Sequence, residues 1–126
     1  CLNRLAPAPE RLAVVDLGEL TRLGITSPRA NSIRELARCV IREEIDLVPG
    51  ADPEVAIQRL LVVPGVGDWT ANYIAMRALR WPDAFPVGDL GLLRSWGAKT
   101  PVALRKAADA WRPWRAYAAM HLWNGY

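Results

Sequence analysis

The stretch LLVVPGVGDWTANYIAMRAL, residues 60–79, decides the fold. An apolar segment stops at two glycines one residue apart, Gly65 and Gly67, and a helical pattern then restarts. Glycines at such a point let another group come close to the backbone. The start of a helix offers unpaired N–H groups and the positive end of the helix dipole, which suit an anion. We therefore predict a tight turn between two helices whose N–H groups can bind a phosphate.

The same residues have a simpler interpretation, which is a tight turn that only packs two helices together. In either case Asp68 can cap the second helix. Small and apolar residues repeat every three or four positions on both sides of the turn, which predicts two buried faces. They are Val55, Ala56, Leu60 and Leu61 before the turn, and Ala71, Ile74, Ala75 and Ala78 after it.

The rest of the chain is also helical in pattern, and no segment has the alternation typical of a strand. Three helix starts combine a capping side chain with a following proline: Ser27-Pro28, Asp52-Pro53 and Thr100-Pro101. Asp16 is predicted to cap a short helix, a helix should run over residues 89–96, and Pro113 should separate the last two helices. The predicted fold class is all-α, with about seven helices and short connections.

Composition sets broad limits on function. The 126 residues suit one domain, and a net charge of +3 with a pI near 9.2 is compatible with a polyanionic partner. The two cysteines, Cys1 and Cys39, form no metal-binding or disulfide pattern, which fits a reducing cytoplasmic compartment. No apolar segment reaches membrane-spanning length, so we expect no membrane partner. The chain starts without methionine, and we expect it to be a piece of a longer protein.

The turn itself resembles a known DNA-binding element. Leu61-X-X-Pro64-Gly-Val-Gly followed by Thr70-Ala71 resembles the helix-hairpin-helix element of DNA repair proteins. The resemblance implies that the backbone at Gly65, Gly67 and Thr70 binds DNA phosphates without reading sequence. It also implies that the backbone carbonyls of Leu61, Val63 and Val66 hold a monovalent cation, Na⁺ or K⁺.

A second element makes the resemblance more specific. Asp89 follows Gly67 by 22 residues, at the end of a loop rich in glycine and proline. This combination resembles the superfamily of helix-hairpin-helix DNA glycosylases. Within it, GDWTANYIAMRAL, FPVGDLGL and RPWRAYAAMHLW resemble the DNA-3-methyladenine glycosylase II family, which excises alkylated bases. The resemblance covers residues 16–126, although Val87-Gly88-Asp89 replaces the Gly-Pro-Asp of the superfamily.

The resemblance implies a catalytic role for Asp89, whose local sequence alone would indicate only a helix cap. An ionised carboxylate can stabilise the positive charge that develops on the sugar when an N-glycosidic bond breaks. Relatives that also cut the DNA backbone carry a lysine at the position of Trp69, so the resemblance implies a monofunctional enzyme that uses water. Asp83 and Asp68 are expected to be loop and cap residues, and Arg112 and Arg115 solvated surface residues.

The resemblance also implies a pocket for a flipped base, formed by Trp69, Tyr73 and Trp123. Their aromatic faces would attract an alkylated, cationic base, although each ring taken singly could equally be part of the core. Asn124 stands where relatives can carry a second aromatic residue, which predicts a more open or more polar pocket.

We thus expect residues 1–126 to be the C-terminal portion of a glycosylase domain. The hairpin would occupy residues 60–79, the catalytic loop residues 80–91, and further helices would precede residue 1. The expected partner is double-stranded DNA with alkylated bases, bound by a monomer in the bacterial cytoplasm. No cofactor is expected to be required, and no iron–sulfur cluster is expected. The isolated piece should bind DNA weakly and release bases poorly.

Two alternatives remain from the sequence. The chain could be a non-catalytic helix-hairpin-helix module that binds duplex DNA, which would need neither Asp89 nor the three aromatic residues. It could instead be a glycosylase for oxidised or mismatched purines, although Trp69 argues against the versions that use a lysine.

Overall fold

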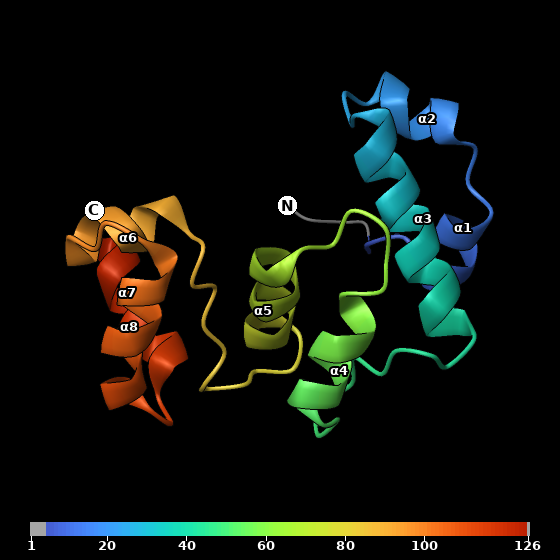
Figure 1. The fold of residues 1–126 in the computed structure, drawn as a ribbon. Helices are drawn as coiled ribbons and strands as arrows, with labels where there is room; N and C mark the ends of the chain where they lie inside the picture. The colour runs from blue at the N-terminus through green and yellow to red at the C-terminus, as the bar shows by residue number, and fades with distance from the viewer. Residues whose placement is uncertain (1–4, 126) are drawn as a thin grey trace.

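The computed structural model describes residues 5–125, in which helices are joined by short loops (Figure 1). The predicted all-α fold is confirmed for this range, with eight α-helices and one 3₁₀ helix in place of about seven helices. The elements are α1 (Pro9–Ala13), α2 (Leu17–Arg22), α3 (Ser27–Ile41), α4 (Pro53–Leu60), α5 (Asp68–Arg77), α6 (Leu90–Trp96), α7 (Pro101–Ala108), η1 (Asp109–Trp111) and α8 (Arg115–Asn124).

The helices form two groups with the α4–α5 hairpin between them. Figure 1 shows α1, α2 and α3 on one side and α6, α7 and α8 on the other. A small core joins Leu60, Val63 and Ala71 of the hairpin to Ile45 and to the partly buried Leu36 and Cys39. A larger core joins α4 and α5 to α6, α7 and α8. The hairpin is therefore held from two sides, which fixes the orientation of its turn.

Packing on two sides explains why the predicted buried faces are only partly right. Ala56, Leu60, Ala71 and Ala75 are buried as predicted, whereas Val55, Leu61 and Ala78 are exposed. Met76 and Leu79 are buried in addition. Because α5 contacts both cores, its buried surface is wider than the single stripe of an amphipathic helix on a flat surface.

Of the helix caps predicted at Asp16, Ser27, Asp52 and Thr100, the last two are confirmed. The Asp52 carboxylate accepts hydrogen bonds from the N–H groups of Glu54 and Val55, and Thr100 Oγ1 accepts one from Ala103. The prediction for Ser27 is wrong, because Thr26 is the N-cap residue and Ser27 is already helical. Asp16 stands at the N-cap of α2 but its side chain makes no capping hydrogen bond.

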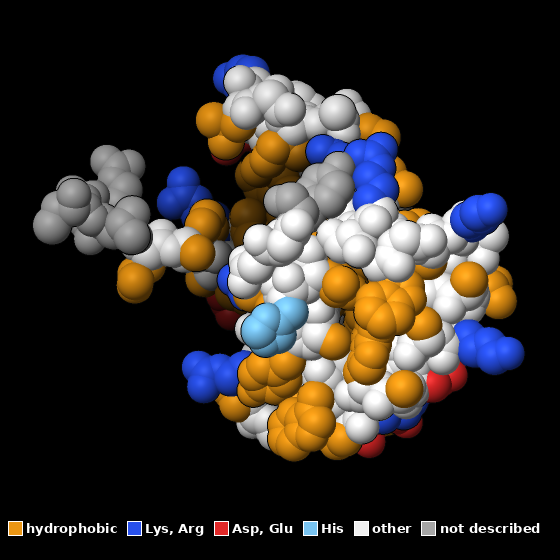
Figure 2. All heavy atoms as spheres, turned by 90° about the vertical axis from the view of Figure 1, so that its left-hand side faces the viewer, with side chains coloured by type: hydrophobic (Ala, Val, Ile, Leu, Met, Phe, Trp, Pro, Cys, Tyr) orange, Lys and Arg blue, Asp and Glu red, His pale blue; other side chains and the backbone are white. Residues whose placement is uncertain are grey.

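The tryptophans outside the predicted pocket pack in or on the fold. Trp81 and Trp111 lie against the larger core, and the Trp111 ring forms T-shaped pairs with Phe85 and Trp96 at centroid distances of 5.9 and 4.7 Å. Figure 2 views the side of α6–α8, where hydrophobic side chains lie exposed among scattered basic and acidic ones. Over residues 5–125, no helix has both the length and the apolar character needed to cross a membrane.

Candidate active site

The hairpin turn is compact and depends on Gly65. The Val66 N–H donates a hydrogen bond to the Val63 carbonyl at 3.0 Å, which closes the turn. Gly65 has a φ of +82°, a conformation that side chains disfavour. A Cβ at this position would also collide with the hydroxyl of Ser32 on α3. Gly65 is thus explained by the packing of the turn on α3, independently of any ligand.

Gly67 is different, because nothing in the described chain requires a glycine there. It is the N-cap residue of α5, its φ is −98°, and a Cβ would meet no atom within 4 Å. The prediction that Asp68 caps α5 is wrong, since Asp68 is the first helical residue. Its carboxylate instead accepts a hydrogen bond from Asn72, one turn further along. The open space above Gly67 leaves the first N–H groups of α5 accessible to a ligand.

Asp89 lies where three helices meet. It is the N-cap residue of α6, and its Oδ1 accepts a hydrogen bond from the Leu92 N–H at 2.9 Å. The same oxygen accepts one from Trp123 Nε1 of α8 at 2.9 Å, and Oδ2 accepts one from Trp69 Nε1 of α5 at 2.8 Å. The carboxylate is thus held by donors from α5, α6 and α8, which fixes the direction of both oxygens.

These donors keep Asp89 ionised. Burial by itself raises the pKa of the Asp89 carboxyl. The hydrogen bonds from Trp123, from the Leu92 N–H, from Trp69 and from the Gly91 N–H outweigh this effect and lower the pKa below its ordinary value. Hydrogen bonds to the charged form of an acid have this effect because protonation would remove the charge that they stabilise. Asp89 is therefore a negative charge at neutral pH.

The three predicted aromatic residues come together next to Asp89. The rings of Trp69 and Tyr73 are stacked, with centroids 5.1 Å apart and planes inclined by 6°. The ring of Trp123 meets Tyr73 edge-on at 6.2 Å. Together with Asp89 they line an open pocket of about 410 Å³. Trp69 is 40% exposed, so its face is accessible from solvent.

Three residues of this site were not predicted from the sequence. Arg77 and Met120 complete the lining of the pocket. Helical spacing could have found both, because Arg77 follows Tyr73 by four positions and Met120 precedes Trp123 by three. Gly91 lies beneath the Trp123 indole, and a Cβ there would meet Asp89 Oδ1 at 3.0 Å and Trp123 Cδ1 at 3.5 Å. Its missing side chain leaves space for the Trp123–Asp89 hydrogen bond.

The structure contradicts the expectation for Arg115 and shows that Asp83 is buried. Asp83 lies in a loop as expected but is only 7% exposed, and Arg115 is 9% exposed, so Arg115 is not a solvated surface residue. The Asp83 carboxylate accepts two hydrogen bonds from Arg115, both at 2.7 Å. The more exposed Arg112 donates a third, at 2.9 Å. Isolated charges along a sequence give no indication of such long-range pairing.

The predicted cation ligands are backbone carbonyls at the end of α4. Leu61 is the C-cap residue of α4, where carbonyls lack helical partners and the helix dipole is negative. The Val63 carbonyl accepts one hydrogen bond from Val66 and retains a second lone pair. Oxygen donors of this kind suit a hard monovalent cation. Among the described side chains, no group of three His, Cys, Asp or Glu residues is arranged to hold a metal ion.

Known proteins with similar sequences are DNA glycosylases. No protein-family model matches the sequence. The chain is 36% identical over 117 residues to DNA-3-methyladenine glycosylase 2 of Escherichia coli K12, a match that covers 93% of this chain and 42% of that protein. The chain is homologous to the DNA-3-methyladenine glycosylases. It spans less than half the length of this glycosylase.

Solved glycosylase structures share the fold. The 3-methyladenine DNA glycosylase of Schizosaccharomyces pombe, solved in complex with abasic DNA, matches with a TM-score of 0.83 at 24% identity. That match covers 98% of this chain and 65% of the solved one. A DNA-3-methyladenine glycosidase from Bacillus halodurans matches with a TM-score of 0.77 at 28% identity, over 94% of this chain and 59% of the solved one. The helical arrangement is thus that of this group of glycosylases.

Proposed function

We propose that this chain carries the base-excision site of a DNA glycosylase that removes alkylated bases from double-stranded DNA. The observation that carries the proposal is the carboxylate of Asp89, which two indole N–H groups hold at the edge of the aromatic pocket. A module that only bound DNA would need neither the fixed charge nor the pocket. The names of the homologues support the same activity.

The pocket suits a base that has left the duplex. The stacked rings of Trp69 and Tyr73 offer a flat aromatic face, with Trp123 beside it. A purine alkylated at a ring nitrogen carries positive charge, and cation–π attraction to such rings contributes about 0.5–2 kcal/mol. The positive charge also weakens the bond to the sugar, so the enzyme needs to supply less stabilisation. Selection and activation of the base therefore use the same property.

Asp89 acts on the sugar. The bond between C1′ and the base nitrogen breaks, and its electron pair leaves with the base, which neutralises the charge of the alkylated ring. The positive charge on the sugar is stabilised by the ionised Asp89 carboxylate beside it. The oxygen of a water molecule then bonds to C1′ and loses one proton to solvent, which leaves an abasic site. Trp69 cannot form a Schiff base, so we infer a monofunctional enzyme.

The hairpin would hold the DNA backbone. The first N–H groups of α5, above the open side of Gly67, suit a phosphate without reading sequence. On the other side of the turn, the carbonyls of Leu61, Val63 and Val66 would hold Na⁺ or K⁺, which supplies positive charge near the phosphate. Thr70, on the first turn of α5, would assist at the same phosphate.

Base release from methylated DNA tests the proposal. The chain and its Asp89→Asn variant are incubated in excess over duplex DNA treated with a methylating agent, and free bases are counted. Asp52→Asn is the matched control, because Asp52 also caps a helix but lies outside the pocket. We expect Asp89→Asn to lower the release rate about 10²–10³-fold, and Asp52→Asn to release bases at the wild-type rate.

Other outcomes would favour the alternatives. DNA binding without base release by the wild-type chain would contradict catalysis by this chain and favour a binding module. Release from DNA that contains an oxidised or mismatched purine, but not from methylated DNA, would contradict the substrate class.

A further inference from the structure

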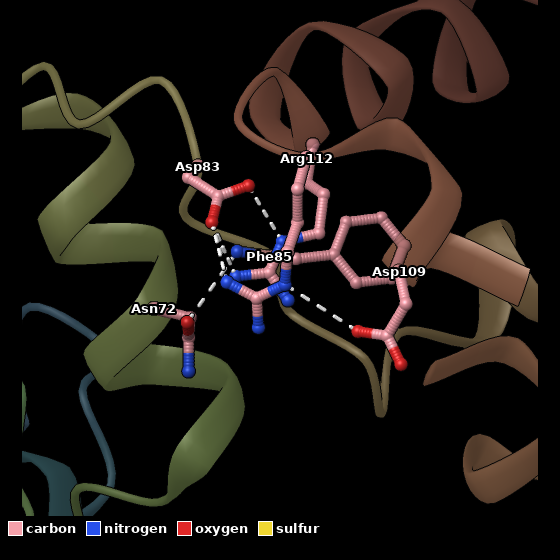
Figure 3. Close-up of polar contacts among 6 residues, drawn as sticks. Asn72, Asp83, Phe85, Asp109 and Arg112 are labelled. Atoms are coloured by element: carbon pink, nitrogen blue, oxygen red, sulfur yellow. Dashed lines mark hydrogen bonds and ion pairs between the residues drawn. The ribbon is translucent and has the colours of Figure 1, made fainter. Parts of the chain in front are cut away.

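The buried charges of Asp83 and Arg115 lie outside the pocket, and their place in the fold connects them to it. Asp83 lies in the loop that ends at Asp89, six residues before it. Arg115 is the first residue of α8, the helix that carries Trp123. Figure 3 shows Asp83 facing the guanidinium group of Arg112, with Asn72 and Phe85 nearby. The ion pair therefore joins two of the elements that meet again at Asp89.

Further hydrogen bonds join the same loop to the helices on either side of it, α8 and α5. The Ala116 N–H donates to the Pro82 carbonyl at 2.8 Å, next to the ion pair. The Phe85 N–H donates to Asn72 Oδ1 of α5 at 3.4 Å, and Asn72 lies three residues after Trp69 and directly before Tyr73. The loop before Asp89 is thus attached to α8 and to α5, the two helices that supply the indole donors.

We propose that Asp83 and Arg115 are positioning residues, whose ion pair sets the placement of α8 so that Trp123 reaches Asp89. Trp123 lies eight residues beyond Arg115, or about 12 Å along the helix axis. A small tilt of α8 about Arg115 therefore displaces the Trp123 indole, because the indole lies far from the point about which the helix turns. The bidentate geometry restricts such a tilt, because a planar guanidinium facing a carboxylate has one preferred orientation.

The inference rests on the proposed role of Asp89, but its test needs no catalysis. The indole N–H signal of Trp123 and the titration of the Asp89 carboxyl are followed by NMR in the full chain. The variants are Asp83→Asn and Arg115→Lys. Asp83→Asn removes the negative charge, whereas Arg115→Lys keeps the positive charge but loses the planar guanidinium that makes two hydrogen bonds. We expect both to move the Trp123 signal upfield and to raise the pKa of Asp89. If Asp83→Asn does not fold, the result for Arg115→Lys tests the inference.

Two control variants separate positioning from general stability. Arg112→Ala removes the more exposed partner of the same carboxylate, and Leu104→Ala weakens the larger core from α7, a helix that carries none of the network residues. We expect both to keep the wild-type Trp123 signal and Asp89 titration, although Leu104→Ala lowers the melting temperature. The inference is overturned where Asp83→Asn and Arg115→Lys lose stability as Leu104→Ala does and still keep both wild-type readouts.

Kinetics distinguish this inference from the proposed function. With methylated DNA, we expect Arg115→Lys to lower the release rate about 10–100-fold at unchanged DNA affinity. Absence of release from the wild-type chain would count against the proposed function alone, because the NMR readouts would still decide on Asp83 and Arg115.

Discussion

The indole Nε1 of Trp123 donates a hydrogen bond of 2.9 Å to Oδ1 of Asp89, although the two residues are 34 positions apart. Trp69 donates to the other oxygen from a third helix. A carboxylate between two indole donors keeps its charge, is fixed in direction and remains next to an aromatic surface. This combination suits the stabilisation of a cationic sugar beside a flat base.

Removal of one indole N–H donor should reduce the stabilisation of the ionised Asp89 carboxylate. Trp123→Phe and Trp69→Phe keep a ring in place and lose the N–H group. We expect both to raise the pKa of Asp89, Trp123→Phe by more, because its hydrogen bond has the larger lowering effect. NMR titration of the Asp89 carboxyl in each variant measures this. Equal titration curves for the wild type and both variants would contradict the role of the indoles.

A methyl group at position 91 should disturb the site without weakening the helix. Gly91→Ala places a Cβ about 3.0 Å from Asp89 Oδ1 and close to the Trp123 ring. Alanine favours the helical state by up to about 1 kcal/mol over glycine, so we expect the stability to change little. Base release should fall about tenfold or more as Trp123 is displaced. Melting temperature and release rate are measured together, and an unchanged release rate would show that the space at Gly91 is not required.

The two glycines of the hairpin turn should behave differently. Gly65→Ala should destabilise the fold by about 1–3 kcal/mol, because φ is +82° and the Cβ collides with Ser32. Gly67→Ala should change stability by less than about 1 kcal/mol, since the lower chain entropy of alanine opposes its weaker capping. Denaturant unfolding measures both changes.

DNA affinity then tests the phosphate site at Gly67. We expect Gly67→Ala to weaken binding of duplex DNA at least about tenfold, because its methyl group would occupy the space of the phosphate and a lost hydrogen bond to a charged group costs about 1.5–3 kcal/mol. Titration of labelled duplex at constant salt measures the effect. Wild-type affinity in Gly67→Ala would remove the argument for a phosphate above this residue.

Asp89 should contribute to stability at neutral pH and lose this contribution in acid. Its pKa is lower in the folded chain than its ordinary value of about 3.9. A lowered folded pKa stabilises the fold above the unfolded pKa, and this stabilisation disappears as the pH falls through the folded pKa. We expect the stability difference between wild type and Asp89→Asn to shrink below about pH 4. A difference that is constant with pH would contradict the lowered pKa.

Local patterns predicted the helices well. Asp52-Pro53 and Thr100-Pro101 determine helix starts through contacts within three residues of the cap, so the sequence contains the needed information. At Ser27-Pro28 the same pattern was shifted by one residue, because proline is tolerated at either of the first two helical positions and Thr26 occupies the cap instead.

The motif that surrounds Asp89 was also visible in the sequence. The turn at Gly65 and Gly67, the loop before Asp89 and the residues Trp69, Tyr73 and Trp123 were all named from it, and the structure brings the three rings and Asp89 to one pocket. Their chemical roles remain predictions until base release is measured.

The sequence by itself determined the helical class, the hairpin turn and the candidate carboxylate, because these depend on neighbours a few positions apart. The tertiary structure alone decided which charges are buried, which rings touch and what holds Asp89 ionised. Asp83 and Arg115 are 32 positions apart, and Asp89 and Trp123 are 34 apart. No local rule relates such residues, since their distance depends on how the hairpin is packed between two groups of helices.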